Sequence, residues 1–307
     1  MRNIQTDLAV EAHENFIGDS ESAPSGVNVD VKKIGDIKRT LVKITSKNAE
    51  KLLQKKQGDY ITIEYGKLQF MSDDNKANLT TLVEYEIKKL LQKKNVPPKG
   101  NVLVVGLGNH DITPDAIGPL TVSKLDITRH LFSFLPKESR NKVRSVSALA
   151  PGVLGTTGIE TQEIISAVTE KTVPSAIIAI DALASRSMDR LGRTIQLADT
   201  GIEPGSGVGN KRKGLNFESL GVPVIAVGVP TVADAATVAD DAVAAVISKF
   251  NNLNIDEDER YNFVKKSMGS EAASMMVTLK EIDLIVSDIS NILADGINSA
   301  LQGRGGI

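Results

Sequence analysis

The sequence predicts an α/β fold, in which a mostly parallel, twisted sheet has helices on both faces and follows a small N-terminal α+β portion. Two observations favour this fold. From residue 101 onward, apolar stretches such as VLVVGL and SAIIAI alternate with stretches of helical periodicity. Strands that are apolar throughout are buried on both faces, which is typical of a parallel sheet between two layers of helices. The 307 residues are enough for one large core.

The N-terminal portion is predicted to contain a polar segment, two strands and two helices. Residues 12–37 are polar with interspersed glycines, so we expect a surface arm or loop there. Residues 38–45 and 59–66 have the composition of strands, and a short helix between them would be capped by Ser46. A longer helix is expected over residues 76–94, because apolar side chains recur on one face.

Strands and helices then alternate to the end of the chain. One strand, in RTIQLAD, is expected to run in the opposite sense to the others. The predicted strands lie at 102–107, 144–152, 175–183, 193–199 and 223–230, and the predicted helices end near Leu125 or span 160–172, 232–250 and 279–301.

Composition excludes several classes of function. Lys and Arg number 36 against 38 Asp and Glu, so the net charge of −2 gives no electrostatic reason for nucleic-acid or membrane binding. Without cysteine there are no disulfides, thiolate metal sites or cysteine nucleophiles, which fits a reducing compartment. The N-terminus lacks the apolar core of a signal peptide, and no stretch is apolar enough to span a bilayer. We therefore expect a cytoplasmic protein.

Two aspartates follow predicted strands. Asp115 comes after VLVVGL and a glycine-rich turn, and Asp181 closes SAIIAID. Because ligands bind at the carboxyl ends of the strands in such sheets, the two carboxylates could approach each other there. Such a pair can activate a water and protonate a leaving group, or it can hold a divalent cation. The alternative is that Asp115 is an N-terminal helix cap and Asp181 a turn residue at a strand end.

Other motifs give weaker signals. The GLGN turn lacks the third glycine of a dinucleotide-binding G-x-G-x-x-G, and a tight turn is the alternative. Residues 203–214 are either a loop that binds an acidic peptide or a phosphate, or a solvated connection. No G-x-S-x-G or H-E-x-x-H motif is present, and of the three histidines only His110 lies near the predicted site.

Long strings along nearly the whole chain carry a resemblance to one family. They are QTDLAVEA, VVGLGN with TPDAIGP, ITRHLF, APGVLGTTGIET, IIAIDALASRS, DTGIEPGSGVGNKRK and GVPVIAVGVPTVADA. On these strings, from Thr6 to about Leu301, the sequence resembles the germination protease family of spore-forming bacteria. Agreement over so many separate segments is far more specific than any single motif above.

The resemblance implies an endopeptidase that degrades the small acid-soluble proteins coating spore DNA. The family is regarded as an atypical aspartic-type peptidase, and its two catalytic aspartates fall in TPDA and IDALA, here Asp115 and Asp181. Its fold is similar to that of hydrogenase maturation proteases, which use acids in like positions and a histidine to bind nickel. No histidine here obviously supplies that third ligand. The resemblance therefore favours a water-activating pair of aspartates, with no metal and no cofactor.

Further residues are candidates to bind substrate. Asn109 and the backbone at Gly108 could hold the substrate carbonyl or orient an acid. The alternative for Asn109 is a turn residue that tolerates left-handed geometry. Acidic flanks in the substrates call for basic side chains, with plain surface charge as the alternative. The basic candidates are Arg186, Lys211, Arg212 and Lys213.

The resemblance also gives the N-terminus a role. Family members are made as zymogens that remove an N-terminal propeptide. Their substrates share the motif Thr-Glu-(Phe or Ile)-Ala-Ser-Glu, cut after the first Glu, and TDLAVE at residues 6–11 is similar to it. We therefore expect self-cleavage between Asp7 and Leu8, with residues 1–7 as the propeptide and 8–307 as a single α/β peptidase domain.

The resemblance further implies a homotetramer in the spore core, with the small acid-soluble proteins as substrates and no direct binding to nucleic acid or a membrane. Two other functions are left open by the sequence. One is a metal-dependent maturation-type protease on the same fold. The other is a non-catalytic module that binds acidic spore proteins, or a nucleotide at the GLGN turn.

Overall fold

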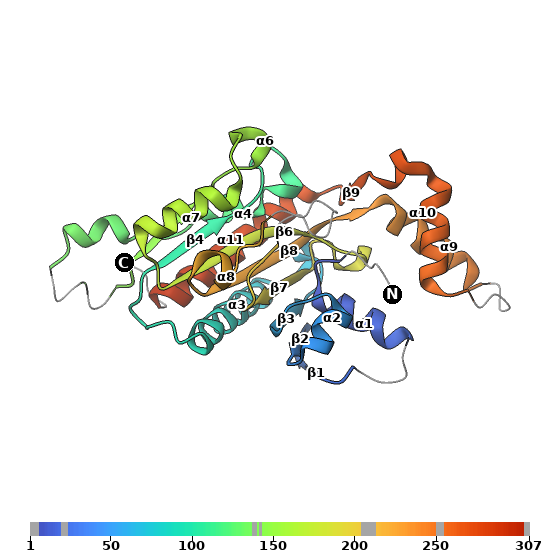
Figure 1. The fold of residues 1–307 in the computed structure, drawn as a ribbon, viewed down its shortest axis with the longest axis horizontal. Coiled ribbons are helices and arrows are strands. Elements are labelled where there is room, and N and C mark those ends of the chain that lie inside the picture. Colours follow the sequence, from blue (N-terminus) through green and yellow to red (C-terminus); the bar gives the residue numbers. More distant parts are fainter. Residues whose placement is uncertain are drawn as a thin grey trace.

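The computed structural model describes residues 6–19, 24–136, 140, 143–203, 213–249 and 255–303. Within these ranges one mixed sheet of nine strands forms the centre of the molecule (Figure 1). Its order is β1-β2-β3-β7-β8-β6-β4-β5, and β9 pairs with β8 beyond this path. The strands are β1 (Val27–Ile34), β2 (Ile37–Ile44), β3 (Gly58–Glu64), β4 (Val102–Gly106), β5 (Val146–Leu149), β6 (Ala176–Ala184), β7 (Thr194–Ala198), β8 (Val224–Asp234) and β9 (Met276–Thr278).

The sheet has a parallel half and an antiparallel half. β4 pairs in parallel with β5 and β6, and β6 pairs in parallel with β8. The strands from β1 through β2, β3 and β7 to β8, and the β8–β9 pair, are antiparallel. The prediction of a mostly parallel sheet is therefore wrong for one half, while the opposite sense of residues 193–199 is confirmed in β7. An apolar strand indicates burial rather than direction, and β3 and β7 are largely buried although antiparallel.

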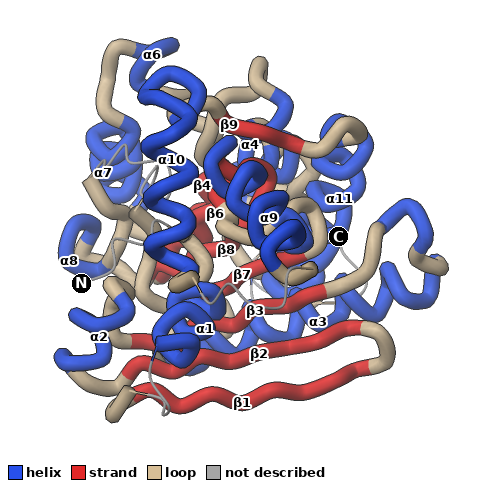
Figure 2. The backbone as a smooth tube through the Cα atoms, turned by 90° about the vertical axis from the view of Figure 1, so that its right-hand side faces the viewer, coloured by secondary structure: helices blue, strands red, loops and turns tan. Residues whose placement is uncertain are grey.

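Helices cover both faces of the sheet. α3, α4 and α11 pack on one face, whereas α1, α2, α7 and α8 lie on the other. Figure 2 shows β1, β2 and β3 side by side at one edge, and in Figure 1 α9 and α10 project beyond the end of β8. The helices are α1 (Ala9–Asp19), α2 (Lys47–Leu53), α3 (Asp73–Lys93), α4 (Ile117–Val122), α6 (Leu154–Thr157), α7 (Thr161–Thr172), α8 (Phe217–Leu220), α9 (Ala235–Ile247), α10 (Glu257–Ala273) and α11 (Ile282–Gln302).

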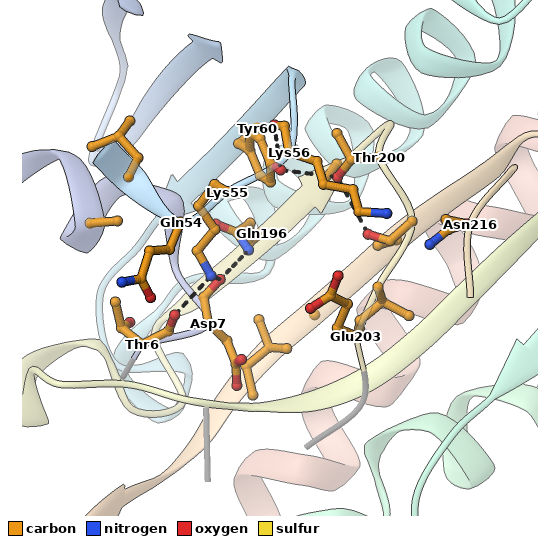
Figure 3. Close-up of a pocket in the computed structure, with 18 residues that line it drawn as sticks. Thr6, Asp7, Gln54, Lys55, Lys56, Tyr60, Gln196, Thr200, Glu203 and Asn216 are labelled. Carbon is orange, nitrogen blue, oxygen red and sulfur yellow. Dashed lines mark hydrogen bonds between the residues drawn. The ribbon is translucent and has the colours of Figure 1, made fainter. Parts of the chain in front are cut away.

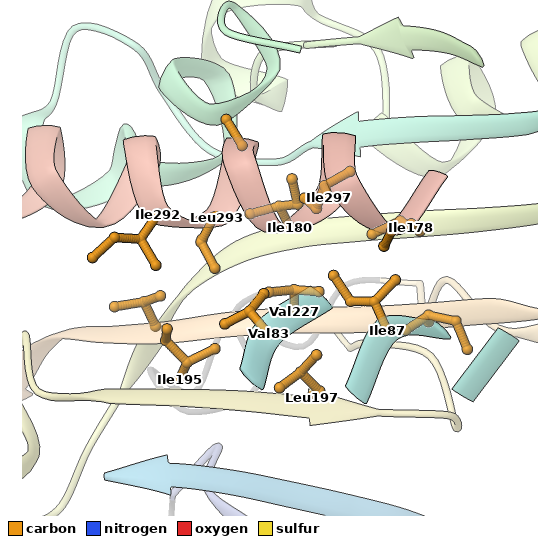
Figure 4. Packing of buried hydrophobic residues seen from close by; sticks show 14 of the residues in the cluster. Val83, Ile87, Ile178, Ile180, Ile195, Leu197, Val227, Ile292, Leu293 and Ile297 are labelled. Atoms are coloured by element: carbon orange, nitrogen blue, oxygen red, sulfur yellow. The ribbon is translucent and has the colours of Figure 1, made fainter. Parts of the chain in front are cut away.

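The main core lies between the sheet and the helices α3 and α11. Ile178 and Ile180 of β6 point into it, and Ile87 of α3 and Leu293 of α11 meet them (Figure 4). All four side chains are fully buried. A sheet face and two amphipathic helices thus share one apolar layer, which fixes β6 at the centre of the fold.

The polar segment 12–37 is not the surface arm or loop that the sequence predicts. It contains most of α1 and the whole of β1. β1 is an edge strand in which only Val27 is buried, and it is held by pairing along its length with β2. α1 is fixed at its start, where Leu8 and Ala9 are completely buried. The alternation of Val27, Val29 and Val31 in β1 is a strand signal that the prediction missed among the surrounding polar residues.

Most other predicted elements are confirmed, with shifted ends. Ser46 caps α2 by accepting the N–H of Ala49 at 3.1 Å. The long helix predicted at 76–94 starts earlier, at Asp73, behind Ser72 as its cap. The helix predicted to run to about Leu125 ends at Val122, and α10 and β9 are additions that the sequence pattern did not predict.

Replacing Ile87 with Ala is expected to lower the free energy of unfolding by about 2–5 kcal/mol, because the change leaves a cavity in the core against β6. Chemical denaturation followed by circular dichroism measures this loss. Asn78→Ala, at an exposed position of the same helix, is the matched control and should change stability by less than about 0.5 kcal/mol. A loss below about 1 kcal/mol for Ile87→Ala would contradict the packing described here.

Candidate active site

The loop that carries Asp115 folds back on β6. It starts where β4 ends, and there the N–H of Leu107 donates to the carbonyl of Ile180 at 2.8 Å. Gly108 has a φ of 108°, and a Cβ at this position would collide with the carbonyl oxygen of Asp115. Only glycine therefore lets this turn close. The Asp115 carboxylate accepts the N–H of Asn109 at 2.7 Å, so the interpretation of GLGN as a tight turn is confirmed.

Asp115 is not the helix cap that the alternative interpretation proposed. It ends a short 3₁₀ turn, η2 (Thr113–Asp115), and α4 follows with Ala116 as its N-cap residue and no capping side chain. η2 lies against both β6 and β8. The half-buried Asp115 carboxylate thus closes its own loop beside the two central strands.

Asp181 lies inside β6 rather than at its end. The strand continues to Ala184, and the Asp181 side chain is only 7% exposed. Its Oδ1 accepts the N–H of Ala182 at 3.0 Å. Because side chains alternate along a strand, Asp181 shares the sheet face of Leu183, which is the face covered by the N-terminal segment. The prediction of a strand-end position is wrong, since β6 runs on beside β8.

Three residues form a row across this face of the sheet. Gln196 of β7 pairs with Gly228 of β8, which in turn pairs with Asp181 of β6. Neighbouring strands lie about 4.8 Å apart, so about 10 Å separates the backbones at Gln196 and Asp181. Gly228 contributes no side chain between them, and the side chain of Leu183 leans into the space that a Cβ there would need. Leu183 therefore fills the space over Gly228, with the Gln196 amide at one end of the row and the Asp181 carboxylate at the other.

A pocket of about 310 Å³ opens over one end of this row (Figure 3). Gln196, Gly228 and Leu183 form part of its floor. The C-terminal end of α2 and residues 200–203 form walls, and the segment that precedes α1 enters it with Thr6 and Asp7.

That segment is held by both backbone and side-chain contacts. Asp7 donates its N–H to the carbonyl of Ala184 at 3.3 Å and accepts the N–H of Ala184 with its carboxylate at 2.9 Å. The carbonyl oxygen of Asp7 accepts from Lys55 Nζ at 3.2 Å and from Gln196 Nε2 at 3.1 Å. Leu8 is fully buried. The peptide bond predicted to be cut is thus fixed on the sheet face that carries Asp181.

Glu11, in the first turn of α1, anchors the other end of residues 6–11. Its carboxylate accepts the N–H of Arg186 at 2.9 Å, the N–H of Ser187 at 3.1 Å and the hydroxyl of Ser185 at 2.7 Å. Arg190 adds an ion pair at 3.4 Å, and the hydroxyl of Thr6 donates to the same carboxylate. Residues 6–11 are therefore docked at both ends against the chain that follows Asp181.

The other predicted binding residues lie apart from this pocket. Asn109 Oδ1 accepts the N–H of Asp111 at 3.0 Å, which makes it a turn residue, although φ is positive at Gly108 rather than at Asn109. The Arg186 guanidinium lies 5.1 Å from the ring centre of Tyr261. Lys213 is exposed, and Lys211 and Arg212 lie outside the described residues.

Sequence reasoning missed Lys55 and Gln196. Lys55 belongs to the run QKKQ, which has the composition of an exposed helix end. It enters the pocket because Gln54, at the end of α2, adopts a left-handed φ of 51° that stops the helix. Gln196 did carry a signal, because it is a polar residue in the middle of the buried strand TIQLA.

Burial lowers the pKa of the Lys55 ammonium, while the charges of Asp7, Glu203 and Glu11 act in the opposite direction. Lys55 thus lies in the pocket with the carboxylates of Asp7, Glu203 and Glu11 nearby. In the part of the chain that the structure describes, no group of three or more His, Asp or Glu residues is placed to hold a metal ion. None of the described helices is long and apolar enough to cross a membrane.

Comparison with known proteins identifies the family. A sequence model described as germination protease matches residues 4–267. The chain belongs to the germination protease family. It is 43% identical to the germination protease of Clostridium acetobutylicum and 44% identical to that of Clostridium perfringens strain 13, over 98% of this chain and 96% of each relative. The germination protease of Geobacillus sp. strain WCH70 is 38% identical over 98% of this chain and 94% of the relative.

Membership confirms the family and the enzyme class, a peptidase, that the sequence predicts. The family match from residue 4 to residue 267 covers both the N-terminal segment and the strands that bind it. The comparisons identify the family but assign no role to individual residues.

The stability of this family member should fall on the acid side because of His13. The side chain is 7% exposed on α1, its Nε2 has no partner among the described residues, and burial lowers its pKa while Glu14 opposes the shift. The stabilising contribution is present above the pKa of the unfolded chain and is lost as pH falls toward the lowered folded value.

Unfolding curves measured from about pH 8 down to about pH 5 test this expectation. His13→Gln should flatten the decline relative to the unchanged protein, because glutamine does not titrate. Parallel curves for the two proteins would show that His13 does not contribute to the pH dependence.

Proposed function

We propose that this chain is an endopeptidase that starts the degradation of small acid-soluble spore proteins during germination. Family membership supports a protease. The observation that carries the proposal is the row Gln196–Gly228–Asp181, beside which the chain binds its own TDLAVE segment in a pocket. A surface that holds this segment on the same sheet face as a buried carboxylate has the chemical groups that peptide hydrolysis requires.

Asp115 and Asp181 would form the catalytic pair. One carboxylate accepts a proton from a water, whose oxygen attacks the peptide carbonyl carbon. The other carboxyl group donates a proton to the amide nitrogen as the C–N bond breaks. Two acids close together share one proton, so the protonation belongs to the pair rather than to either residue. The loop contact of Asp115 with Asn109 and the burial of Asp181 support different environments for the two acids.

The same site would cut the chain itself between Asp7 and Leu8. Asp7 is paired with the backbone of Ala184, so an acidic residue before the cut is recognised through hydrogen bonds to β6. While residues 6–11 occupy the pocket, a substrate chain is kept out of it. This supports a zymogen with residues 1–7 as the propeptide and 8–307 as the peptidase domain. A homotetramer, the spore core as its location, and a fold shared with hydrogenase maturation proteases belong to the same proposal.

Cleavage of a small acid-soluble spore protein by the chain that begins at Leu8 tests the proposed pair. Asp115→Asn and Asp181→Asn should each lower the rate at least about 100-fold, because each removes one proton-transferring group. Asp111→Asn, an exposed position in the Asp115 loop, is the matched control and should keep the activity.

The same assay separates the alternatives. Cleavage that survives a chelator and is lost in both variants supports the pair. Loss of cleavage with the chelator would favour a metal-dependent maturation-type protease. Binding without cleavage would indicate a binding module, and unchanged cleavage in both variants would contradict the proposed roles of Asp115 and Asp181.

Incubation of the full-length chain should release residues 1–7, and mass spectrometry should find Leu8 as the new N-terminus. The first-order rate should not depend on protein concentration if each molecule cuts its own segment. Asp7→Ala should slow the reaction at least about tenfold, because the substitution removes the hydrogen bond to Ala184. Asp181→Asn serves as the control for contaminating proteases, and release of the segment from this variant would count against self-cleavage.

A further inference from the structure

The carbonyl oxygen of Asp7 has two side-chain donors in the pocket. Lys55 Nζ lies 3.2 Å and Gln196 Nε2 lies 3.1 Å from it (Figure 3). Lys55 also donates to the carbonyl of Thr6 at 2.8 Å. The Asp7 carbonyl belongs to the peptide bond that is proposed to be cut. Two donors that converge on one carbonyl oxygen are what stabilisation of an oxyanion requires.

Gln196 is oriented by a second contact. Its Oε1 accepts the N–H of Ala9 at 2.7 Å, so its Nε2 is the atom left to face the carbonyl of Asp7. The side-chain amide thus spans residues 7 to 9, on both sides of the bond. Gln196 also lies in the row with Gly228 and Asp181. The donors to the Asp7 carbonyl therefore lie on the same sheet face as the buried acid.

Lys55 is placed by the way α2 ends. The left-handed conformation of Gln54 turns the chain out of the helix, and the half-buried Lys55 side chain enters the pocket. Asp7, Glu11 and Glu203 lie near enough to favour its charged form against the cost of burial. A positive charge beside a carbonyl oxygen stabilises developing negative charge more in a partly buried site than at the surface.

We propose that Lys55 and Gln196 are catalytic residues that hold the carbonyl oxygen of the residue before the cut and stabilise the oxyanion formed on it. This inference rests on the proposed peptidase function and on the cut after Asp7. When water attacks the carbonyl carbon, the C=O electron pair moves to the oxygen that faces Lys55 and Gln196. When the intermediate collapses, the C–N bond to Leu8 breaks and the acid of the aspartate pair protonates the leaving nitrogen. Once residues 1–7 leave, the same donors face the carbonyl of a substrate chain.

Self-cleavage of the full-length chain is the first readout. Lys55→Met keeps the length of the side chain without its charge, and Gln196→Glu keeps the acceptor for Ala9 without the donor. Each should lower the first-order rate about 10²–10³-fold, the usual cost of losing one oxyanion donor. Lys51→Met, at an exposed position on α2, is the matched control and should cleave at the unchanged rate. Lys55→Arg keeps a charged donor and should recover part of the loss.

A second readout separates catalysis from docking of the segment. Each variant is made as the chain that begins at Leu8 and is given a synthetic peptide of residues 1–16. The loss should lie in kcat, with KM changed only a few-fold, because the donors act most strongly on the transition state. The melting temperature of each variant shows whether it is folded, and if Lys55→Met is unfolded the decision rests on Gln196→Glu and Lys55→Arg.

The proposed function and the inference about Lys55 and Gln196 would be contradicted by different results. If the unchanged protein cleaves and the Asp115→Asn and Asp181→Asn variants do not, but Lys55→Met and Gln196→Glu keep kcat, this inference is wrong and the proposed function stands. A loss confined to KM would likewise overturn it and leave only a docking role. If Asp115→Asn and Asp181→Asn both keep full activity, the proposed mechanism fails and the inference fails with it.

Discussion

A carboxylate in the middle of a buried strand constrains the centre of this molecule. β6 has a hydrogen-bonded neighbour on each side and apolar layers on both faces, so a polar side chain in it must find polar partners nearby. Asp181 is the one charged residue of that strand, and its carboxylate accepts a backbone N–H one residue further along. The neighbouring strand provides a glycine directly beside it. The extensive core under α3 and α11 offsets the desolvation cost, which is why the acid can be buried at all.

One short stretch of chain links this acid to the N-terminal segment. From Asp181 the backbone runs to Ala184, which pairs with Asp7, and on to Arg186 and Ser187, which bind Glu11. The end of β6 thus positions both the candidate acid and the peptide beside it. A shift of this strand end would move both together, so their relative placement depends on local backbone geometry rather than on distant packing.

The sequence was informative where burial left a periodic pattern. The central strands are apolar throughout, α3 and α11 show helical periodicity, and Ser46 is a common capping residue. All of these were predicted within a few residues. β1 was missed because its alternating valines lie within a polar segment, and strand direction was only partly predictable because burial does not encode it. Asp115 and Asp181 were predicted from sequence motifs. Lys55 was not predicted, because it enters the pocket only through the left-handed conformation of Gln54 at the end of α2, and the sequence does not indicate that conformation.

The position of Leu8 immediately before α1 has a consequence for the chemistry of the chain ends. A cut after Asp7 would create a new α-amino group one residue before the start of a helix, where the helix dipole already carries partial positive charge. The Lys55 ammonium lies close by, and Leu8 is buried where a charged amine is poorly solvated. The Lys55 ammonium and the helix dipole would therefore repel the new α-ammonium of Leu8 and attract the new α-carboxylate of Asp7. Cleavage would thus turn a neutral peptide bond into two charged ends that this site treats differently, since one is stabilised beside Lys55 and the other is destabilised there.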